Sequence, residues 1–171
     1  MGQRVSPFIT AVAVFVLDRI TKEFIKVHLS LWDARTIIPG LFNIVHTENP
    51  GIAFGMLSDL ANPWRNLILI GFSLAVLAII STILLRLGSQ GQLLRMGLAL
   101  VMGGALGNLF DRIVHGTVTD FVEVHVGQHY FPAFNVADSS ITIGACLLLL
   151  DMWYSKERRS QTASIPGEVP K

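Results

Sequence analysis

Four long apolar segments constrain this chain more than any other feature of its sequence. The clearest, Asn66 to Leu85, contains no charged residue. A helix that crosses a membrane needs about 20 predominantly apolar residues. The other three segments have similar lengths and run from about Phe8 to Ile25, Leu93 to Ile113 and Val136 to Tyr154. The sequence therefore predicts an all-α integral membrane protein, built as a bundle of four transmembrane helices.

The composition supports this fold class and excludes several others. Of the 171 residues, 51% are hydrophobic and only 15% are charged, and the mean hydropathy is +0.56. Ordinary soluble domains carry about 25% charged residues. The formal net charge of +1 leaves no basic surface for nucleic acid. Cys146 is the only cysteine, which excludes an internal disulfide and CxxC metal or redox motifs.

We expect one membrane-embedded domain, residues 1–159, followed by a flexible C-terminal tail, residues 160–171. Arg4 and the apolar stretch Phe8 to Leu17 imitate a signal peptide, but no small-x-small cleavage site follows them. We therefore expect this segment to be retained. Four spans place both termini on the same side of the membrane. The positive charges divide evenly between the two faces, so they do not decide which side that is.

Two long connections, about 26–65 and 114–135, lie on the same face of the predicted bundle, and short strands are expected in both. Leu41–Thr47 and Ile52–Met56 flank the turn-forming residues 48–51, which predicts a strand pair. Thr117–Val126 alternates as a strand does, and its even-numbered face carries Asp120 among four valines. An ordinary surface acid would point to the opposite face.

Asp120 and Asp138 are the candidate catalytic residues. Asp138 lies at the start of the fourth apolar segment, where a carboxylate is costly to desolvate. A helix N-terminal cap is the alternative interpretation, because free amides and the helix dipole favour an acid there. Two carboxylates that lie close together tend to share one proton. The apolar strand face predicts a raised pKa for Asp120, and the helix N-terminus favours Asp138 as the anion.

Charged pairs occur in the second half of the first apolar segment. Asp18 and Lys22 are four residues apart, as are Arg19 and Glu23, so each pair can neutralise its charges on one helical face. Either pair can also be interpreted as a structural clamp at the end of the helix. For Asp18 and Lys22 the sequence alone leaves both interpretations open.

The third apolar segment combines small and polar residues. Gly103 and Gly107 predict close helix packing, because small residues let helix backbones approach each other in lipid. Asn108 and Arg112 lie four residues apart on one face beyond them. That face can present an amide and a guanidinium group to a carbonyl or a carboxylate.

Other functions fit the sequence less well. Neither Gly-x-Ser-x-Gly nor His-Glu-x-x-His occurs. His125 and His129 stand in a strand-like context, which disfavours a helical zinc-ligand pair. A proton-coupled transporter is expected to place its acids near the membrane midplane, whereas here they cluster at segment ends. A membrane scaffold would leave Asp120 and Asp138 without a role.

Five motifs together resemble the lipoprotein signal peptidases (signal peptidase II) of bacteria. They occur in the order of that family, each at the expected helix end or loop, and the resemblance covers about residues 8 to 155. The motifs are Asp18-Arg19-Ile20-Thr21-Lys22, Asn49-Pro50-Gly51-Ile52-Ala53-Phe54, Gly107-Asn108-Leu109-Phe110-Asp111-Arg112, Val118-Thr119-Asp120-Phe121 and Phe134-Asn135-Val136-Ala137-Asp138-Ser139.

The resemblance implies a four-helix aspartyl protease of the bacterial inner membrane, with cytoplasmic termini and a small extracytoplasmic β cradle around residues 41–57. Asp120 and Asp138 would form its catalytic dyad, without metal or organic cofactor. Such an enzyme acts as a monomer in membrane lipid and cuts diacylglyceryl-modified prolipoproteins just before the lipidated cysteine. The residues expected to shape the site or contact substrate and the inhibitor globomycin are Asn49, Gly51, Asn108, Arg112 and Asn135, with Asp18 and Lys22 beside them.

Overall fold

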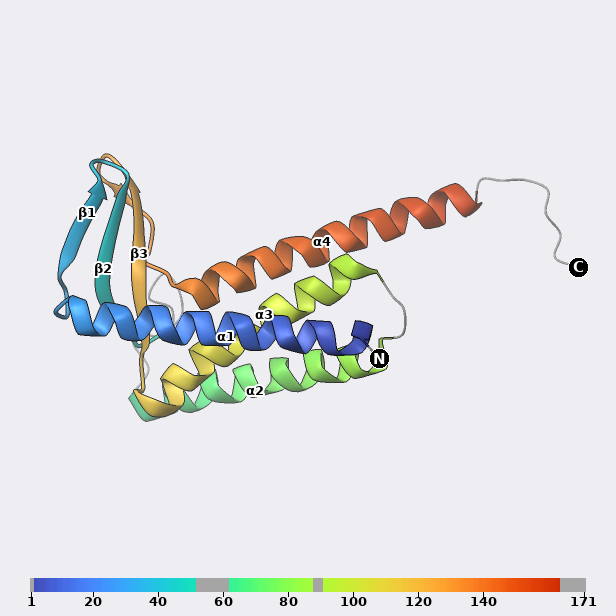
Figure 1. The fold of residues 1–171 in the computed structure, drawn as a ribbon, viewed down its shortest axis with the longest axis horizontal. Helices are drawn as coiled ribbons and strands as arrows, with labels where there is room; N and C mark the ends of the chain where they lie inside the picture. Colours follow the sequence, from blue (N-terminus) through green and yellow to red (C-terminus); the bar gives the residue numbers. More distant parts are fainter. Residues whose placement is uncertain (1, 52–61, 88–90, 164–171) are drawn as a thin grey trace, which may run out of the picture.

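Four helices run alongside one another, and a small β-sheet stands at one end of them (Figure 1). The structure is a computed structural model that describes residues 2–51, 62–87 and 91–163. The helices are α1 (Gly2–His28), α2 (Asn62–Arg86), α3 (Gln92–Val114) and α4 (Val136–Ala163). Each contains one of the four predicted apolar segments, so the helical part of the prediction is confirmed.

Three of the described helices are long and apolar enough to cross a membrane: Trp64–Arg86, Gln92–Val114 and Val136–Lys156. Helix α1 is not among them, because charged residues interrupt the apolar surface of its second half. Length and composition therefore identify three candidate spans among the described helices, and the fourth span stays a prediction. Helix α4 continues to Ala163, past the expected start of a flexible tail at residue 160, and residues 164–171 lie outside the described part of the chain.

Helix α3 is the centre of the bundle and packs against the other three helices. Its small residues make this possible. A Cβ atom added to Gly104 would lie 2.4 Å from the Ala137 carbonyl oxygen, and one added to Gly103 would lie 2.7 Å from the Ala11 carbonyl oxygen. A Cβ on Gly107 would similarly approach Asp18, at 2.5 Å. The close packing predicted at Gly103 and Gly107 is confirmed.

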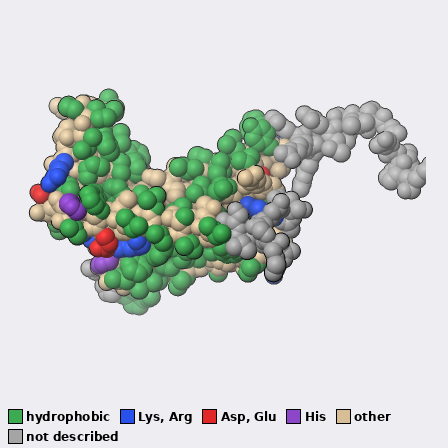
Figure 2. Space-filling model, viewed as in Figure 1, with side chains coloured by type: hydrophobic (Ala, Val, Ile, Leu, Met, Phe, Trp, Pro, Cys, Tyr) green, Lys and Arg blue, Asp and Glu red, His purple; other side chains and the backbone are tan. Residues whose placement is uncertain are grey.

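Large apolar side chains cover the outside of the helices. Phe72 and Ile79 on α2 are 68% and 60% exposed, and Leu149 on α4 is 66% exposed. Figure 2 shows hydrophobic side chains over much of the visible helical surface, whereas charged side chains lie toward its two ends. Exposed apolar surface of this extent requires an apolar environment or a partner, as expected for helices that face lipid.

The sheet is antiparallel and contains four strands in the order β1 (Ala34–Ile38), β2 (Phe42–Asn49), β3 (Val118–Val126) and β4 (His129–Tyr130). Short strands were expected in both long connections, and the described residues of both contribute strands to this sheet. The strand predicted over Thr117–Val126 is confirmed as β3.

The strand pair expected around a turn at residues 48–51 is partly wrong. Strand β2 continues through Glu48 and Asn49, because these residues pair with Thr119 and Val118 of β3. On its other side β2 pairs with β1, which the sequence did not reveal. The second strand of the expected pair, Ile52–Met56, lies outside the described residues. The extended β2 places Asn49 next to the start of β3.

Candidate active site

Asp120 lies near the start of β3 and is held there by the sheet register, opposite Thr47 of β2. Its side chain is almost fully buried, at 3% exposure. Asn49 Nδ2 donates to one carboxylate oxygen of Asp120 at 3.0 Å, and Asn135 Nδ2 donates to the other at 2.7 Å. Burial, together with the neighbouring charge of Asp138, raises the pKa of Asp120 to about 7, although those two hydrogen bonds lower it. The raised pKa predicted for Asp120 is confirmed.

Asp138 lies in the first turn of α4 and takes part in capping that helix. The cap residue itself is Asn135, whose Oδ1 accepts from the Asp138 backbone N–H at 2.9 Å. Asp138 Oδ2 accepts in return from the Asn135 backbone N–H at 3.3 Å, which is the reciprocal pattern of a capping box. Asn108 Nδ2 donates to the other oxygen, Oδ1, at 2.7 Å. Capping is therefore one role of Asp138, but one carboxylate oxygen bonds outside its own helix.

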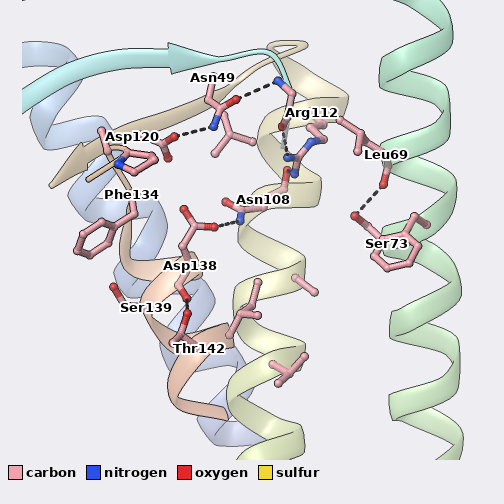
Figure 3. A pocket seen from close by; sticks show the side chains of 18 of the residues that line it. Asn49, Leu69, Ser73, Asn108, Arg112, Asp120, Phe134, Asp138, Ser139 and Thr142 are labelled. Atoms are coloured by element: carbon pink, nitrogen blue, oxygen red, sulfur yellow. Dashed lines mark hydrogen bonds between the residues drawn. The ribbon is translucent and has the colours of Figure 1, made fainter. Parts of the chain in front are cut away.

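Asn135 connects the two acids. Its side chain bonds Asp120 while its backbone N–H bonds Asp138, and it is fully buried. A strand residue and a helix residue are thereby brought within reach of one asparagine. Figure 3 shows both carboxylates at the same end of a cavity, each with an asparagine amide directed at it.

The cavity has a volume of about 690 Å³ and two chemically distinct regions. Its polar end is formed by the two acids with Asn49, Asn108 and Arg112. Its walls are mainly apolar and come from α2, α3, α4 and the segment before α4, including Leu69, Phe72, Val76, Ala105, Phe131, Phe134 and Ile141. A ligand that fits this cavity must combine a polar group with a substantial apolar part.

Arg112 places a positive charge in the same cavity as the acids. Its guanidinium donates to the Gly51 carbonyl oxygen at 3.1 Å and to the Asn108 carbonyl oxygen at 3.3 Å. The Gly51 backbone N–H in turn donates to Asn49 Oδ1 at 2.9 Å. Arg112 and Gly51 therefore hold the end of β2, and with it Asn49, against the end of α3.

Asp18 and Lys22 form the predicted ion pair, at 2.8 Å, but they lie behind the cavity rather than in it. Both are fully buried between α1 and α3. Lys22 also pairs with Asp111 at 2.7 Å, and Asp111 bonds Arg19, which pairs with Glu23 as predicted. Two contacts join this cluster to the site: Lys22 donates to Asn108, and Asp18 accepts from the Ala137 backbone N–H.

Asp111 is the buried residue that sequence reasoning missed. It stands in the third motif, but no Lys or Arg lies three or four residues away on its own helix, so the local sequence reveals no partner for it. Its partners Lys22 and Arg19 lie on α1, and the Arg19 contact spans 92 positions of sequence. The sequence did contain one indication: an acid in an apolar segment without a local partner is expected to pair with a charge on another helix.

Metal ligation finds no support in the described residues, where no group of three or more His, Cys, Asp or Glu side chains is arranged to hold an ion. His125 lies on β3 with its ring stacked on Tyr130 at 4.7 Å, and His129 lies on the short strand β4. The expectation that these histidines lie on strands rather than on one helical face is confirmed. The acids of the cavity instead bond to asparagine amides.

An integral membrane fold with an acidic, half-apolar cavity agrees with what comparison with known proteins shows. The family model described as "Signal peptidase (SPase) II" matches residues 10–154. The chain belongs to the signal peptidase II family, whose known role is to remove signal peptides from prolipoproteins.

Similar proteins come from several bacteria. The chain is 40% identical over 153 residues to the lipoprotein signal peptidase of Solibacter usitatus, covering 90% of this chain and 93% of that protein. It is 46% identical over 147 residues to the lipoprotein signal peptidase of Pseudomonas paraeruginosa, covering 85% and 86% of the two chains. A bacterial membrane enzyme solved by the in meso method at 2.3 Å resolution superposes with a TM-score of 0.79 at 28% identity, covering 96% of this chain and 94% of that one.

Proposed function

We propose that this chain is a membrane aspartyl endopeptidase that cleaves diacylglyceryl-modified prolipoproteins just before the lipidated cysteine. The observation that carries the proposal is the pair of acids, Asp120 and Asp138, that share Asn135 at the polar end of an otherwise apolar cavity. Membership of the signal peptidase II family indicates the type of reaction. The cavity that both acids line is a site where a peptide bond can be hydrolysed.

The two acids have environments suited to different roles. Asp120, with its pKa raised to about 7, is the protonated member and donates its proton to the scissile carbonyl oxygen. Asp138 accepts hydrogen bonds from Asn108 and Asn135 and is the ionised member. It takes a proton from a water whose oxygen adds to the carbonyl carbon. When the C–N bond breaks, Asp138 returns that proton to the leaving nitrogen, and Asp120 recovers its own from the tetrahedral hydroxyl.

The cavity suits a lipidated, membrane-anchored substrate. The apolar walls between α2 and α4 can accept an acyl chain or the hydrophobic part of a signal peptide. The acids, Asn49 and Arg112 at the other end can hold the scissile peptide group and one water. Anchoring the substrate in the membrane presents its peptide bond at a constant depth, which lowers the entropic cost of alignment.

The topology we propose has four spans, with α1 as the fourth. Its charged residues pair with each other and with Asp111, which lowers the cost of placing them near a membrane. Both termini are then cytoplasmic in the bacterial inner membrane, and the sheet is an extracytoplasmic cradle beside the site. In Figure 1 the sheet stands at the end opposite the start of α1 and the end of α4. The enzyme works as a monomer, without metal or organic cofactor.

The proposal is tested with purified Asp120→Asn and Asp138→Asn and a diacylated precursor. Each variant should lose at least about a hundredfold in kcat, because positioned acids and bases contribute about 10²- to 10⁴-fold. Glu23→Gln is the matched control, since Glu23 is exposed on α1 and pairs only with Arg19 among the described contacts. It should keep normal cleavage.

A second arm uses the same precursor without its diacylglyceryl group. Cleavage of the diacylated form should be strongly preferred, because the apolar cavity otherwise stays unfilled. Normal turnover by either aspartate variant, with the protein still folded by circular dichroism, would show that these acids are not the dyad. Equal cleavage of both precursors would show that the enzyme does not recognise the diacylglyceryl group.

A further inference from the structure

Three asparagines direct amide N–H groups at the two acids, and in each the direction of the amide is set by a donor on its oxygen side. For Asn49 that donor is the Gly51 backbone N–H, at 2.9 Å. For Asn135 it is the Asp138 backbone N–H, also at 2.9 Å. An amide whose oxygen is held by a donor must present its NH₂ group on the other side. The backbone itself therefore orients two of the three amides.

Asn108 is oriented chiefly by a distant side chain. Its Nδ2 donates to Asp138 Oδ1 at 2.7 Å, and its Oδ1 accepts from Lys22 Nζ at 3.1 Å, across 86 positions of sequence. A longer bond from Asn135 Nδ2, at 3.3 Å, reaches the same oxygen. Asn108 thus forms a bridge between a buried ammonium group on α1 and an acid of the cavity on α4.

Lys22 is held so that it can only act as a donor toward Asn108. An ammonium group has three N–H donors and no acceptor, and the three partners of Lys22 are Asp18 at 2.8 Å, Asp111 at 2.7 Å and Asn108. The side chain is fully buried. If the Asn108 amide turned over, its NH₂ would face the ammonium and its oxygen would face the Asp138 carboxylate. Both contacts would be repulsive.

We infer that Lys22 is a positioning residue that fixes the orientation of the Asn108 amide and thereby keeps Asp138 Oδ1 an acceptor. The inference rests on the proposed function, in which Asp138 is the ionised member of the dyad. A donated N–H bond favours the charged form of a carboxylate. The bond to Oδ1, at 2.7 Å, is shorter than the 3.3 Å bond that Oδ2 accepts from the Asn135 backbone N–H. Lys22 does not itself line the cavity, and its one hydrogen bond to a cavity-lining residue among the described contacts is the bond to Asn108. Its charge also acts on Asp120, where it lowers the pKa, so the test reads out Asp138 through the Asn108 background.

Other charged groups also act on Asp138, and the test must separate them from Lys22. Asp120 faces it from β3, and Arg112 approaches it from α3. From α1, Asp18 contacts the backbone N–H of the preceding residue, Ala137. The cavity-lining residues that α2 contributes, Leu69, Phe72, Ser73 and Val76, are uncharged. All of these groups stay in place when Lys22 and Asp111 are changed together.

The test compares Lys22→Met/Asp111→Asn with Asp111→Asn alone. Removing Lys22 by itself leaves two buried carboxylates around a missing cation, which is strongly destabilising, whereas the paired change removes one charge of each sign. We expect kcat to fall by about tenfold to a hundredfold, the range for losing a hydrogen bond to a charged group. KM should change little, and the acidic limb of the kcat–pH profile should move to higher pH.

A double-mutant cycle decides whether Lys22 acts through Asn108. In an enzyme that already carries Asn108→Ala, the further loss of Lys22 should change kcat by less than about threefold. The reason is that the effects of substitutions at two interacting residues do not add. An equally large loss in that background would overturn the inference. So would a Lys22→Met/Asp111→Asn enzyme with the kcat and pH profile of Asp111→Asn.

If Lys22→Met/Asp111→Asn does not fold, Lys22→Gln/Asp111→Asn replaces it. Glutamine keeps a polar side chain but can accept as well as donate, so the Asn108 amide can turn over. The same shift of the pH profile is expected, and an unchanged profile would contradict the inference. Failure of the proposed function is detected separately, by active Asp120→Asn or Asp138→Asn enzymes.

Discussion

At the scale of single residues, the two acids differ because one comes from a strand and the other from a helix. Asp120 is buried on β3, and its carboxylate accepts from the side-chain amides of Asn49 and Asn135. Asp138 lies in the first turn of α4, where the side chains of Asn135 and Asp18 accept hydrogen bonds from the backbone N–H groups. Burial raises the pKa of Asp120, whereas the carboxylate of Asp138 lies at the N-terminal end of α4 and accepts from the Asn108 amide. Two chemically identical side chains therefore suit opposite roles.

The raised pKa of Asp120 predicts an alkaline limb in the kcat/KM profile of the free enzyme. The acid stays protonated until the pH approaches about 7 and loses its donor proton above that value. Activity should therefore fall as the pH rises through this range. The Asn49 hydrogen bond lowers the pKa of Asp120, so Asn49→Ala should move the limb to higher pH.

Asn43→Ala is the matched control for that measurement. Asn43 lies on the same strand, β2, but its amide donates to Glu123 instead of to an acid of the site. Its alkaline limb should coincide with that of the unchanged enzyme. An Asn49→Ala limb that stays in place or moves to lower pH would contradict the account of Asp120.

At the scale of whole elements, the site depends on how closely α3 and α4 approach each other. Gly104 on α3 faces the Ala137 carbonyl oxygen, one residue before Asp138. Gly97 and Gly144 repeat the close contact further along, where a Cβ on either would lie less than 3 Å from the other's carbonyl oxygen, at 2.9 and 2.7 Å. Any widening of this interface displaces the start of α4 and with it one member of the acid pair.

Gly104→Ala is therefore predicted to lower both stability and activity. The added Cβ would lie 2.4 Å from a backbone oxygen, so the helices must separate. We expect a destabilisation of about 1–3 kcal/mol, the usual cost of overpacking, and a larger proportional loss of kcat. Thermal unfolding in detergent and precursor cleavage measure the two effects.

Gly71→Ala on α2 is the control, because a Cβ there meets nothing within 4 Å. Alanine is favoured over glycine inside a helix by about 0.5–1 kcal/mol, so this variant should be as stable as the parent or slightly more so. Equal behaviour of the Gly104 and Gly71 variants would show that the α3–α4 contact does not limit the site.

At the scale of the whole molecule, the four-helix arrangement depends on charge pairing within α1 and between α1 and α3. Composition alone identifies three spans among the described helices. Asp18, Lys22 and Arg19 of α1 are joined by ion pairs, and Asp111 of α3 links Lys22 to Arg19. With its charges neutralised in this way, α1 can lie in the membrane beside α3 despite its composition.

The proposed topology predicts which positions are labelled from outside an intact cell. In a Cys146→Ser background, Ile37→Cys on β1 should react with a membrane-impermeant maleimide, because Ile37 is exposed on the extracytoplasmic sheet. Arg86→Cys, exposed at the far end of α2, should react only after lysis. The Cys146→Ser parent should remain unlabelled, and labelling in the reverse order would invert the topology.

The sequence by itself determined the helices, strand β3 and the two acids. Each of these follows from a local pattern: a length of apolar residues, an alternation of valines around Asp120, and an acid at the start of the last apolar segment. Such patterns arise because a helix or strand buries one side of itself with a fixed period. Residues close together in the sequence therefore reveal the type of element they form.

Only the tertiary structure decided how these pieces are connected. In the folded protein β2 extends to Asn49, and Asn135 bonds both acids. Lys22 reaches Asn108, and Asp111 of α3 pairs with the charges of α1. The Lys22–Asn108 contact joins residues 86 positions apart, and no local period records it. Hydrogen bonds between distant residues depend on how closely helices approach and on the sheet register, and both are set only when the whole chain has folded.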